Sequence, residues 1–177
     1  MKPRIGISRC LLGEDVRYDG SNKLSSAVAD LTPFVEWVPV CPEVEVGMGV
    51  PREPIQLVRD ADGVSSSHEF VRLKGVQTGE DWTERMERWS AARVIALAAA
   101  GISGFVLKAR SPSCGPVGVF VHAGRDAQSP SGRGLFAEAL ATNMPGLPMV
   151  DEEALQYPKV RERFLQSARA FAATLRR

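Results

Sequence analysis

The chain has 177 residues, 44% hydrophobic and 24% charged, a composition typical of an ordinary soluble domain that excludes a disordered or fibrous protein. At this length roughly 70% of the surface of the unfolded chain can be buried, so the fold does not need disulfides. The formal net charge is +1, from 22 Lys and Arg against 21 Asp and Glu, and it indicates no overall preference for nucleic acid or a membrane surface.

The N-terminal part of the chain predicts two strands with a helix between them. Apolar runs favour strands at residues 4–8 and 34–40. Ser21 and Asn22 are capping residues, and they predict a helix that continues to about Leu31 and ends before a proline.

A small hairpin is expected next. Residues 55–59 and 70–74 have the composition of short strands. They flank Asp62-Gly63, a dipeptide that favours a tight turn.

Residues 80–100 predict a long, largely buried helix. Trp82, Met86, Trp89 and Arg93 are spaced by four, three and four positions, so they share one helical face, and an alanine-rich end follows. Gly101 is well placed to end this helix in the left-handed conformation, and residues 104–108 then predict a central strand.

The rest of the chain adds further core elements around one loop. Residues 117–122 continue the core, and residues 123–134, rich in Gly and Ser, predict a mobile surface loop. A helix, a strand and a last helix with an apolar face follow at residues 135–142, 147–150 and 157–175. The alternation predicts an α/β fold: a single domain, residues 1–177, with a mostly parallel sheet flanked by helices.

The cysteine count favours a reducing compartment. Three is an odd number, and the N-terminus has no long apolar run of the kind that a signal peptide needs, so we expect a cytoplasmic protein. Residues 94–106 are nearly uncharged, but Gly101 and Gly104 interrupt them and they are too short to cross a bilayer.

The three cysteines each follow a predicted strand. Cys10 follows the first strand, Cys41 the second, and Cys114 lies in a loop after the central strand. Because the carboxyl ends of parallel strands meet at one edge of the sheet, we expect the three thiols to converge there.

Three thiolates in a reducing compartment suit a soft metal centre. The residues leave two possibilities open, an iron–sulfur cluster or a zinc ion with one open position. Because a 4Fe-4S cluster normally takes four thiolates, three would leave one iron open to a substrate atom, which favours chemistry at the metal over simple electron transfer.

Carboxylates and hydroxyls accompany the thiols. Glu43 and Glu45 follow Cys41, and at least one of them is a candidate acid or base. Ser111 and Ser113 precede the third cysteine, where their hydroxyls can donate to a ligand or shape the turn. The chain has no Gly-X-Ser-X-Gly, phosphate-loop or dinucleotide-binding motif, which excludes the enzyme classes that depend on them.

Five separated motifs resemble the family known as domain of unknown function 523, which includes the thiouracil desulfidases. They are Ser8-Arg9-Cys10-Leu11-Leu12-Gly13, Val16-Arg17-Tyr18-Asp19-Gly20, Cys41-Pro42-Glu43-Val44-Glu45, Val50-Pro51-Arg52-Glu53-Pro54 and Ser111-Pro112-Ser113-Cys114-Gly115. The resemblance implies a 4Fe-4S enzyme that removes sulfur from a thiolated pyrimidine without net redox change.

The resemblance also implies residue roles. Cys10, Cys41 and Cys114 would hold the cluster, with one iron not ligated by cysteine and free to take the thiocarbonyl sulfur. Glu45 would be the acid–base residue, and Ser111 a substrate-binding or proton-relay hydroxyl.

Two departures from relatives refine this expectation. Many relatives have a cysteine where this chain has Val16, so a thiol there is not a required ligand. Some relatives carry an additional C-terminal domain suited to thiolated tRNA, so a small thiolated base, nucleoside or nucleotide is favoured here over tRNA.

The alternatives from other classes are an iron–sulfur sensor or electron-transfer module and a structural zinc domain.

Overall fold

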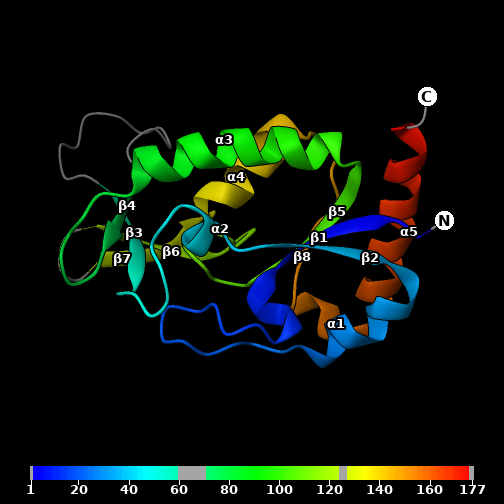
Figure 1. Ribbon diagram of the computed structural model, residues 1–177, viewed down its shortest axis with the longest axis horizontal. Helices are drawn as coiled ribbons and strands as arrows, with labels where there is room; N and C mark the ends of the chain where they lie inside the picture. The colour runs from blue at the N-terminus through cyan, green and yellow to red at the C-terminus, as the bar shows by residue number, and fades with distance from the viewer. Residues whose placement is uncertain (1, 60–70, 124–126, 176–177) are drawn as a thin grey trace.

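A parallel sheet, which we call sheet A, organises the larger part of the molecule. The computed structural model describes residues 2–59, 71–123 and 127–175 (Figure 1). In spatial order the strands of sheet A are β2 (Glu36–Val40), β1 (Arg4–Ser8), β5 (Ile102–Leu107) and β8 (Met149–Asp151), and every pair is parallel. This confirms the expected α/β fold.

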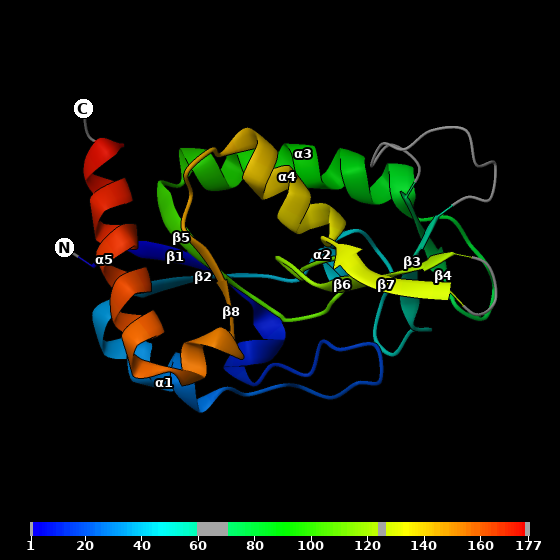
Figure 2. The same ribbon diagram turned by 180° about the vertical axis from the view of Figure 1, so that it is seen from behind.

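Helices cover both faces of sheet A (Figures 1 and 2). On one face, α1 (Ser26–Leu31) and α5 (Pro158–Thr174) pack against side chains of β1. On the other, α3 (Thr83–Ala99) and α4 (Leu135–Asn143) pack against β5. All six residues of β5 are buried, as expected for a central strand covered on both sides.

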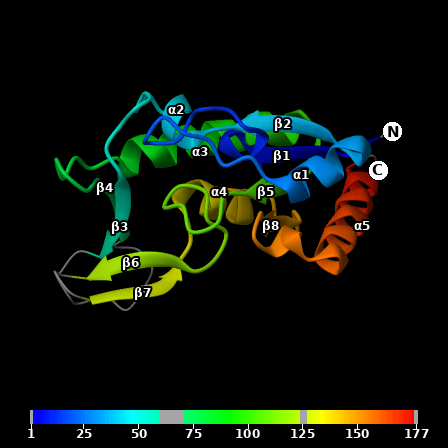
Figure 3. The same cartoon turned by 90° about the horizontal axis from the view of Figure 1, so that it is seen from below.

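A second sheet, sheet B, lies at the opposite end of the molecule from α5 (Figure 3). Its spatial order is β4 (Val71–Gly75), β3 (Ile55–Arg59), β6 (Val119–Ala123) and β7 (Ala127–Gly132). Strands β3 and β4 are antiparallel, as the expected hairpin requires, although the Asp62-Gly63 turn lies outside the described residues. Leu57 and Leu73 pack with Met86 of α3, so this one helix joins both sheets.

One expectation about residues 117–134 is confirmed and one is wrong. Residues 117–122 continue the core as expected, since Val119 and Val121 are buried there, and β6 pairs with β3 in sheet B. The predicted mobile loop at residues 123–134 contains β7, which pairs antiparallel with β6. Its sequence is polar because β7 is an exposed edge strand, a position that also tolerates Pro130.

The first helix begins later than expected, at Ser26. The preceding residues are held in an extended path by the first cysteine loop: the N–H of Lys23 donates to the Cys10 carbonyl, and that of Ser25 to the Leu11 carbonyl. The side chain of Asn22 stabilises this extended segment, because its oxygen accepts a hydrogen bond from the Leu24 N–H.

The two long helices are less buried than their patterns suggest. In α3 the buried stripe consists of Thr83, Met86, Ser90, Val94 and Leu97, so the expected large burial of this helix is wrong. In α5 only Phe164 and Ala168 are fully covered. Within the described residues, no helix is both long and apolar enough to span a membrane.

Short helices complete the described chain, and two of them carry the cysteine loops. They are η1 (Arg9–Leu12), η2 (Thr32–Phe34), α2 (Pro42–Glu45) and η4 (Ala154–Gln156).

Candidate functional site

Each cysteine lies beyond the carboxyl end of a strand of sheet A. Cys10 is in η1, directly after β1, and Cys41 directly follows β2. Cys114 lies in the loop after β5. All three line one cavity of about 410 Å³, so the structure brings together the three residues that the sequence selects as ligands.

The main chains of the first two cysteines are fixed by hydrogen bonds. The Cys10 carbonyl accepts from the N–H groups of Gly13, at 3.3 Å, and Lys23, at 2.8 Å. Cys41 precedes α2, and its N–H donates to the Glu45 carboxylate at 3.1 Å. Both thiols therefore start from backbone positions that neighbouring residues define.

The third cysteine lies in a tight serine turn. The Ser111 hydroxyl accepts from the Cys114 N–H at 3.1 Å, and the Ser111 carbonyl accepts from the Gly115 N–H at 2.7 Å. Gly134 packs directly on this turn: a Cβ there would lie 2.5 Å from the Ser113 carbonyl carbon. Only glycine allows the segment before α4 to approach the turn so closely.

Burial favours the protonated form of all three thiols. Burial raises the pKa of Cys10 to about 11, and the nearby Cys41 adds to the rise. Burial also raises the pKa of Cys41 and of Cys114. A metal centre that binds here must therefore displace the thiol protons, since thiolates are the ligands.

Three thiols are the soft donor set of the cavity, and they come from separate loops. Among residues 2–59, 71–123 and 127–175, no group of three or more His, Cys, Asp and Glu side chains is arranged to hold one metal ion. Three thiols around one cavity fit a cluster, in which each thiolate binds a different iron.

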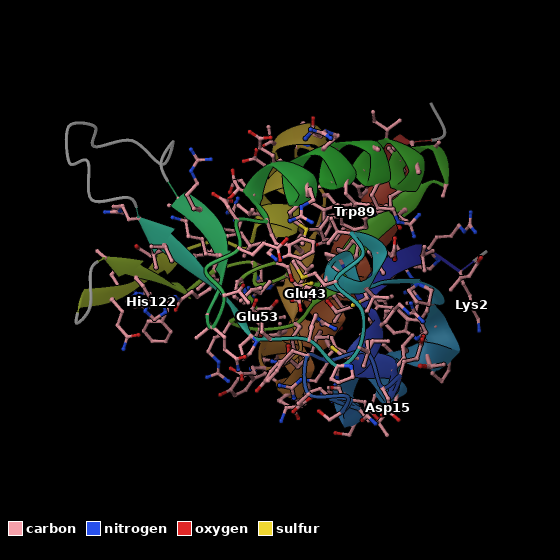
Figure 4. The ribbon with its side chains drawn as sticks, turned by 60° about the vertical axis from the view of Figure 1, so that its left-hand side comes forward. Lys2, Asp15, Glu43, Glu53, Trp89 and His122 are labelled. Carbon is pink, nitrogen blue, oxygen red and sulfur yellow. The ribbon has the colours of Figure 1, made fainter. Side chains whose placement is uncertain are left out.

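Glu43 is the carboxylate of the cavity. It lies on α2, near the centre of the molecule (Figure 4), and it is the only acidic residue among the described residues that line the cavity. Arg52 donates to its Oε2 from Nε at 2.8 Å and from Nη2 at 2.6 Å. The side chains of Arg52 and Glu43 are only 6% and 14% exposed, so this ion pair is shielded from solvent.

A chain of hydroxyls connects Glu43 to the serine turn. The buried Ser113 hydroxyl donates to Glu43 Oε1 at 2.7 Å and lies 3.0 Å from the Ser111 hydroxyl. A hydroxyl has only one proton, so while Ser113 donates to Glu43 the hydrogen between the two serines comes from Ser111. The same Ser113 hydroxyl lies 3.7 Å from the Cys114 Sγ.

Positive charge surrounds this carboxylate. The cationic side chains that line the cavity are Arg9, Arg17, Lys23, Arg52, Lys108 and Arg110. Four of them have acidic partners, which are Glu14, Glu43, Glu152 and Glu153. Arg17 and Lys23 have no acidic partner within 4.0 Å among the residues that the structure describes.

Comparison with known proteins decides the family. Residues 5–152 match the 2-thiouracil desulfurase family. The chain belongs to this family.

Two relatives illustrate the relationship. The solved structure of the [4Fe-4S]-dependent thiouracil desulfidase TudS is similar to this 2-thiouracil desulfurase family member with a TM-score of 0.68 and 29% identity, and the match covers 92% of this chain and 97% of TudS. The uncharacterized protein YbbK of Bacillus subtilis (strain 168) is 32% identical over 111 residues, which is 62% of this chain and 71% of YbbK.

In this family member, the structure places Glu45 away from the cavity. Glu45 is not a lining residue. One of its carboxylate oxygens accepts from the Cys41 N–H, and the other lies 3.1 Å from Nε of Arg93 on α3. Glu45 therefore holds the Cys41 loop against α3, whereas Ser111 lines the cavity.

Sequence reasoning missed Arg52. The residue lies in the Val50-Pro51-Arg52-Glu53-Pro54 motif, but only the fold shows that its side chain reaches Glu43, nine positions earlier. The sequence signal for Arg52 is an arginine that lies among prolines and close to the loop with Cys41 and two glutamates. This signal does not identify the carboxylate partner of Arg52, because Glu43 and Glu45 are equally plausible by distance along the chain.

Proposed function

We propose that this chain is an iron–sulfur-dependent desulfidase that replaces the thiocarbonyl sulfur of a thiolated pyrimidine with oxygen and releases sulfide. One observation carries the proposal: three cysteine thiols line the same cavity as a solvent-shielded carboxylate. The name of the similar TudS structure, a [4Fe-4S]-dependent thiouracil desulfidase, supports the chemistry and the cofactor.

Cys10, Cys41 and Cys114 would hold the 4Fe-4S cluster. A cluster held by three cysteines has one iron without a protein ligand, and when bound it supplies a Lewis acid for the thiocarbonyl sulfur. The role of the protein is then to orient the pyrimidine, to deliver water to the carbon and to move protons.

The reaction needs no oxidant or reductant. Water supplies the oxygen of the new carbonyl, and its two protons leave with the sulfur as hydrogen sulfide. A base must take a proton from water as the oxygen adds, and an acid must return one to the departing sulfur. A single carboxylate can do both in turn.

We assign this acid–base role to Glu43 in place of Glu45. Glu43 faces the cavity, and its Oε1 is the end of the serine chain. Glu45 is occupied with the Cys41 N–H and Arg93 outside the cavity. In this assignment Glu45 supports the ligand loop and takes no part in proton transfer.

In this proposal the Ser111 hydroxyl contacts the substrate or relays a proton. Its Oγ accepts from the N–H groups of Ser113, at 3.3 Å, and Cys114, at 3.1 Å, while Ser113 connects it to Glu43. Two backbone donors favour negative charge on this oxygen, which suits a group that passes a proton toward Glu43.

The cations at the cavity favour an anionic substrate. Arg17 and Lys23 lie in the lining, and Tyr18 beside them presents a partly exposed ring suited to a planar base. Among thiolated bases, nucleosides and nucleotides, this charge favours the nucleoside monophosphate.

An electron-transfer or sensor module would not need these groups. Such a protein requires the cluster ligands alone, whereas here a shielded glutamate and two linked serines line the same cavity. The enzyme is therefore the function that the geometry supports best.

The test is anaerobic reconstitution with iron and sulfide, followed by incubation with 2-thiouracil, 4-thiouridine and 4-thiouridine monophosphate. We expect loss of the thiocarbonyl absorbance with one sulfide released for each molecule consumed, and the highest kcat/KM for the monophosphate. A reconstituted, iron-loaded protein that leaves all three compounds unchanged would exclude the proposed reaction.

A further inference from the structure

Arg52 lines the cavity and makes several hydrogen bonds there. Besides the two hydrogen bonds to Glu43 Oε2, its Nη1 donates to the Gly49 carbonyl at 2.8 Å, and its Nη2 donates to the Val16 carbonyl at 3.0 Å. Four of the five guanidinium N–H groups are thus used, and the side chain is only 6% exposed. The residue is held in a single orientation.

These contacts determine how Glu43 is presented. Both hydrogen bonds from Arg52 end on Oε2, and the one from Ser113 ends on Oε1. Rotation of the carboxylate would break all three. A free glutamate side chain samples many rotamers, so this fixation removes conformational freedom before a substrate arrives.

Arg52 also joins the two loops that carry Cys10 and Cys41. Val16 belongs to the segment after Cys10, and Gly49 to the segment after α2. The backbone N–H of Arg52 donates in addition to the Tyr18 carbonyl at 2.8 Å. Arg52 therefore connects the segments that follow Cys10 and Cys41 through both its side chain and its main chain.

We infer that Arg52 is a positioning residue of the reaction: it holds the Glu43 carboxylate in its productive orientation and acts on turnover through Glu43. The inference rests on the proposed function. Lysine cannot replace this arrangement, because an ammonium group lacks the planar fork that reaches a carboxylate and two carbonyls at once.

The test compares Arg52→Ala, Glu43→Gln and the double variant with the wild-type holoenzyme, using iron and sulfide content, kcat and KM. We expect normal cluster content in all of them, a fall in kcat of about 100-fold for Arg52→Ala and little change in KM, because misplacing an acid–base group slows the reaction without removing substrate contacts. If Arg52 acts through Glu43, the double variant is no slower than Glu43→Gln alone.

Arg161→Ala is the matched control. Arg161 also joins main-chain carbonyls, those of Leu155 and Gln156, to a carboxylate, that of Asp30, but it lies on α5 away from the cavity. It should retain wild-type kcat. If Arg52→Ala does not fold, Arg52→Lys is measured by the same criteria, with a fall in kcat and unchanged KM expected.

The outcomes separate the two proposals. A wild-type holoenzyme that desulfurises while Arg52→Ala keeps its kcat overturns the positioning role alone. So does a double variant whose losses multiply, or a loss of iron in Arg52→Ala that Glu43→Gln does not share, since Arg52 would then act on the loops directly. An inactive wild-type holoenzyme overturns the proposed function and this inference with it.

Discussion

The Ser113 hydroxyl donates to Glu43 Oε1 at 2.7 Å, although the two residues are 70 positions apart in the chain. Ser113 comes from the loop that carries Cys114, and Glu43 from the short helix that follows Cys41. This hydrogen bond joins two cysteine loops through groups that can exchange a proton. The chemistry that we propose depends on this connection.

The two glutamates of α2 should differ sharply when substituted. Glu43→Gln should retain the cluster and lose turnover by roughly 100-fold or more, because a carboxamide cannot accept a proton from water. Glu45→Gln is the matched control, two positions away and outside the cavity, and should retain turnover within a fewfold. Equal losses in kcat for the two variants, measured at equal iron content, would contradict the assignment of the acid–base role to Glu43.

Ser113→Ala should weaken both the fold and the reaction. It removes the donor to Glu43 and a partner of Ser111 in a fully buried position, so the free energy of unfolding should fall by about 1–3 kcal/mol. Turnover should fall as well, with iron content unchanged. Ser103→Ala, which removes a buried hydroxyl that donates to the Arg4 carbonyl, should lower stability without lowering kcat.

Each cysteine should be required for the metal centre. Cys10→Ala, Cys41→Ala and Cys114→Ala should each fail to retain iron and sulfide after anaerobic reconstitution, as measured by elemental analysis. A buried thiol contributes to the metal-free fold only as a small apolar group, so melting of the metal-free variants should change little. Retention of a full cluster by any one variant would remove that cysteine from the ligand set.

Glu53 predicts a pH dependence of stability away from the thiols. The side chain of Thr78 and the N–H groups of Thr78 and Gln77 donate to its carboxylate and lower its pKa. A lowered folded-state pKa stabilises the fold fully above the unfolded-state pKa, and this stabilisation disappears as the pH falls through the folded-state pKa.

Denaturant unfolding of Glu53→Gln tests this directly. The variant should be less stable than the wild type at neutral pH, and the two should converge as the pH falls through the lowered folded-state pKa of Glu53. A difference in unfolding free energy that stays constant from neutral to acidic pH would show that the three hydrogen bonds do not favour the ionised form.

Much of the fold could be predicted because its signals are local. The apolar runs around Ile5 and Phe105 mark the central strands of sheet A, and Gly101 ends α3 with a φ of 71° as expected. Strand β7 has no such signal: its residues are polar because one edge of sheet B faces solvent, and only pairing with β6 identifies it as a strand.

The candidate site could also be predicted only where its residues have local sequence signals. The three cysteines could be brought together from sequence because strand ends in a parallel sheet share an edge. The choice between Glu43 and Glu45 could not, because α2 sends the first carboxylate into the cavity and the second toward Arg93, and this depends on how α2 packs. Arg52 depends on three contacts from separate segments, which no local pattern encodes.

The most direct test of the central claim is the origin of the new oxygen. The wild-type holoenzyme is incubated anaerobically with a thiolated pyrimidine in ¹⁸O-labelled water without a reductant, and the product and the sulfide are quantified. We predict one ¹⁸O in each product molecule and one sulfide for each, with Glu43→Gln forming little of either. A product without ¹⁸O, or turnover that requires an added reductant, would contradict the account.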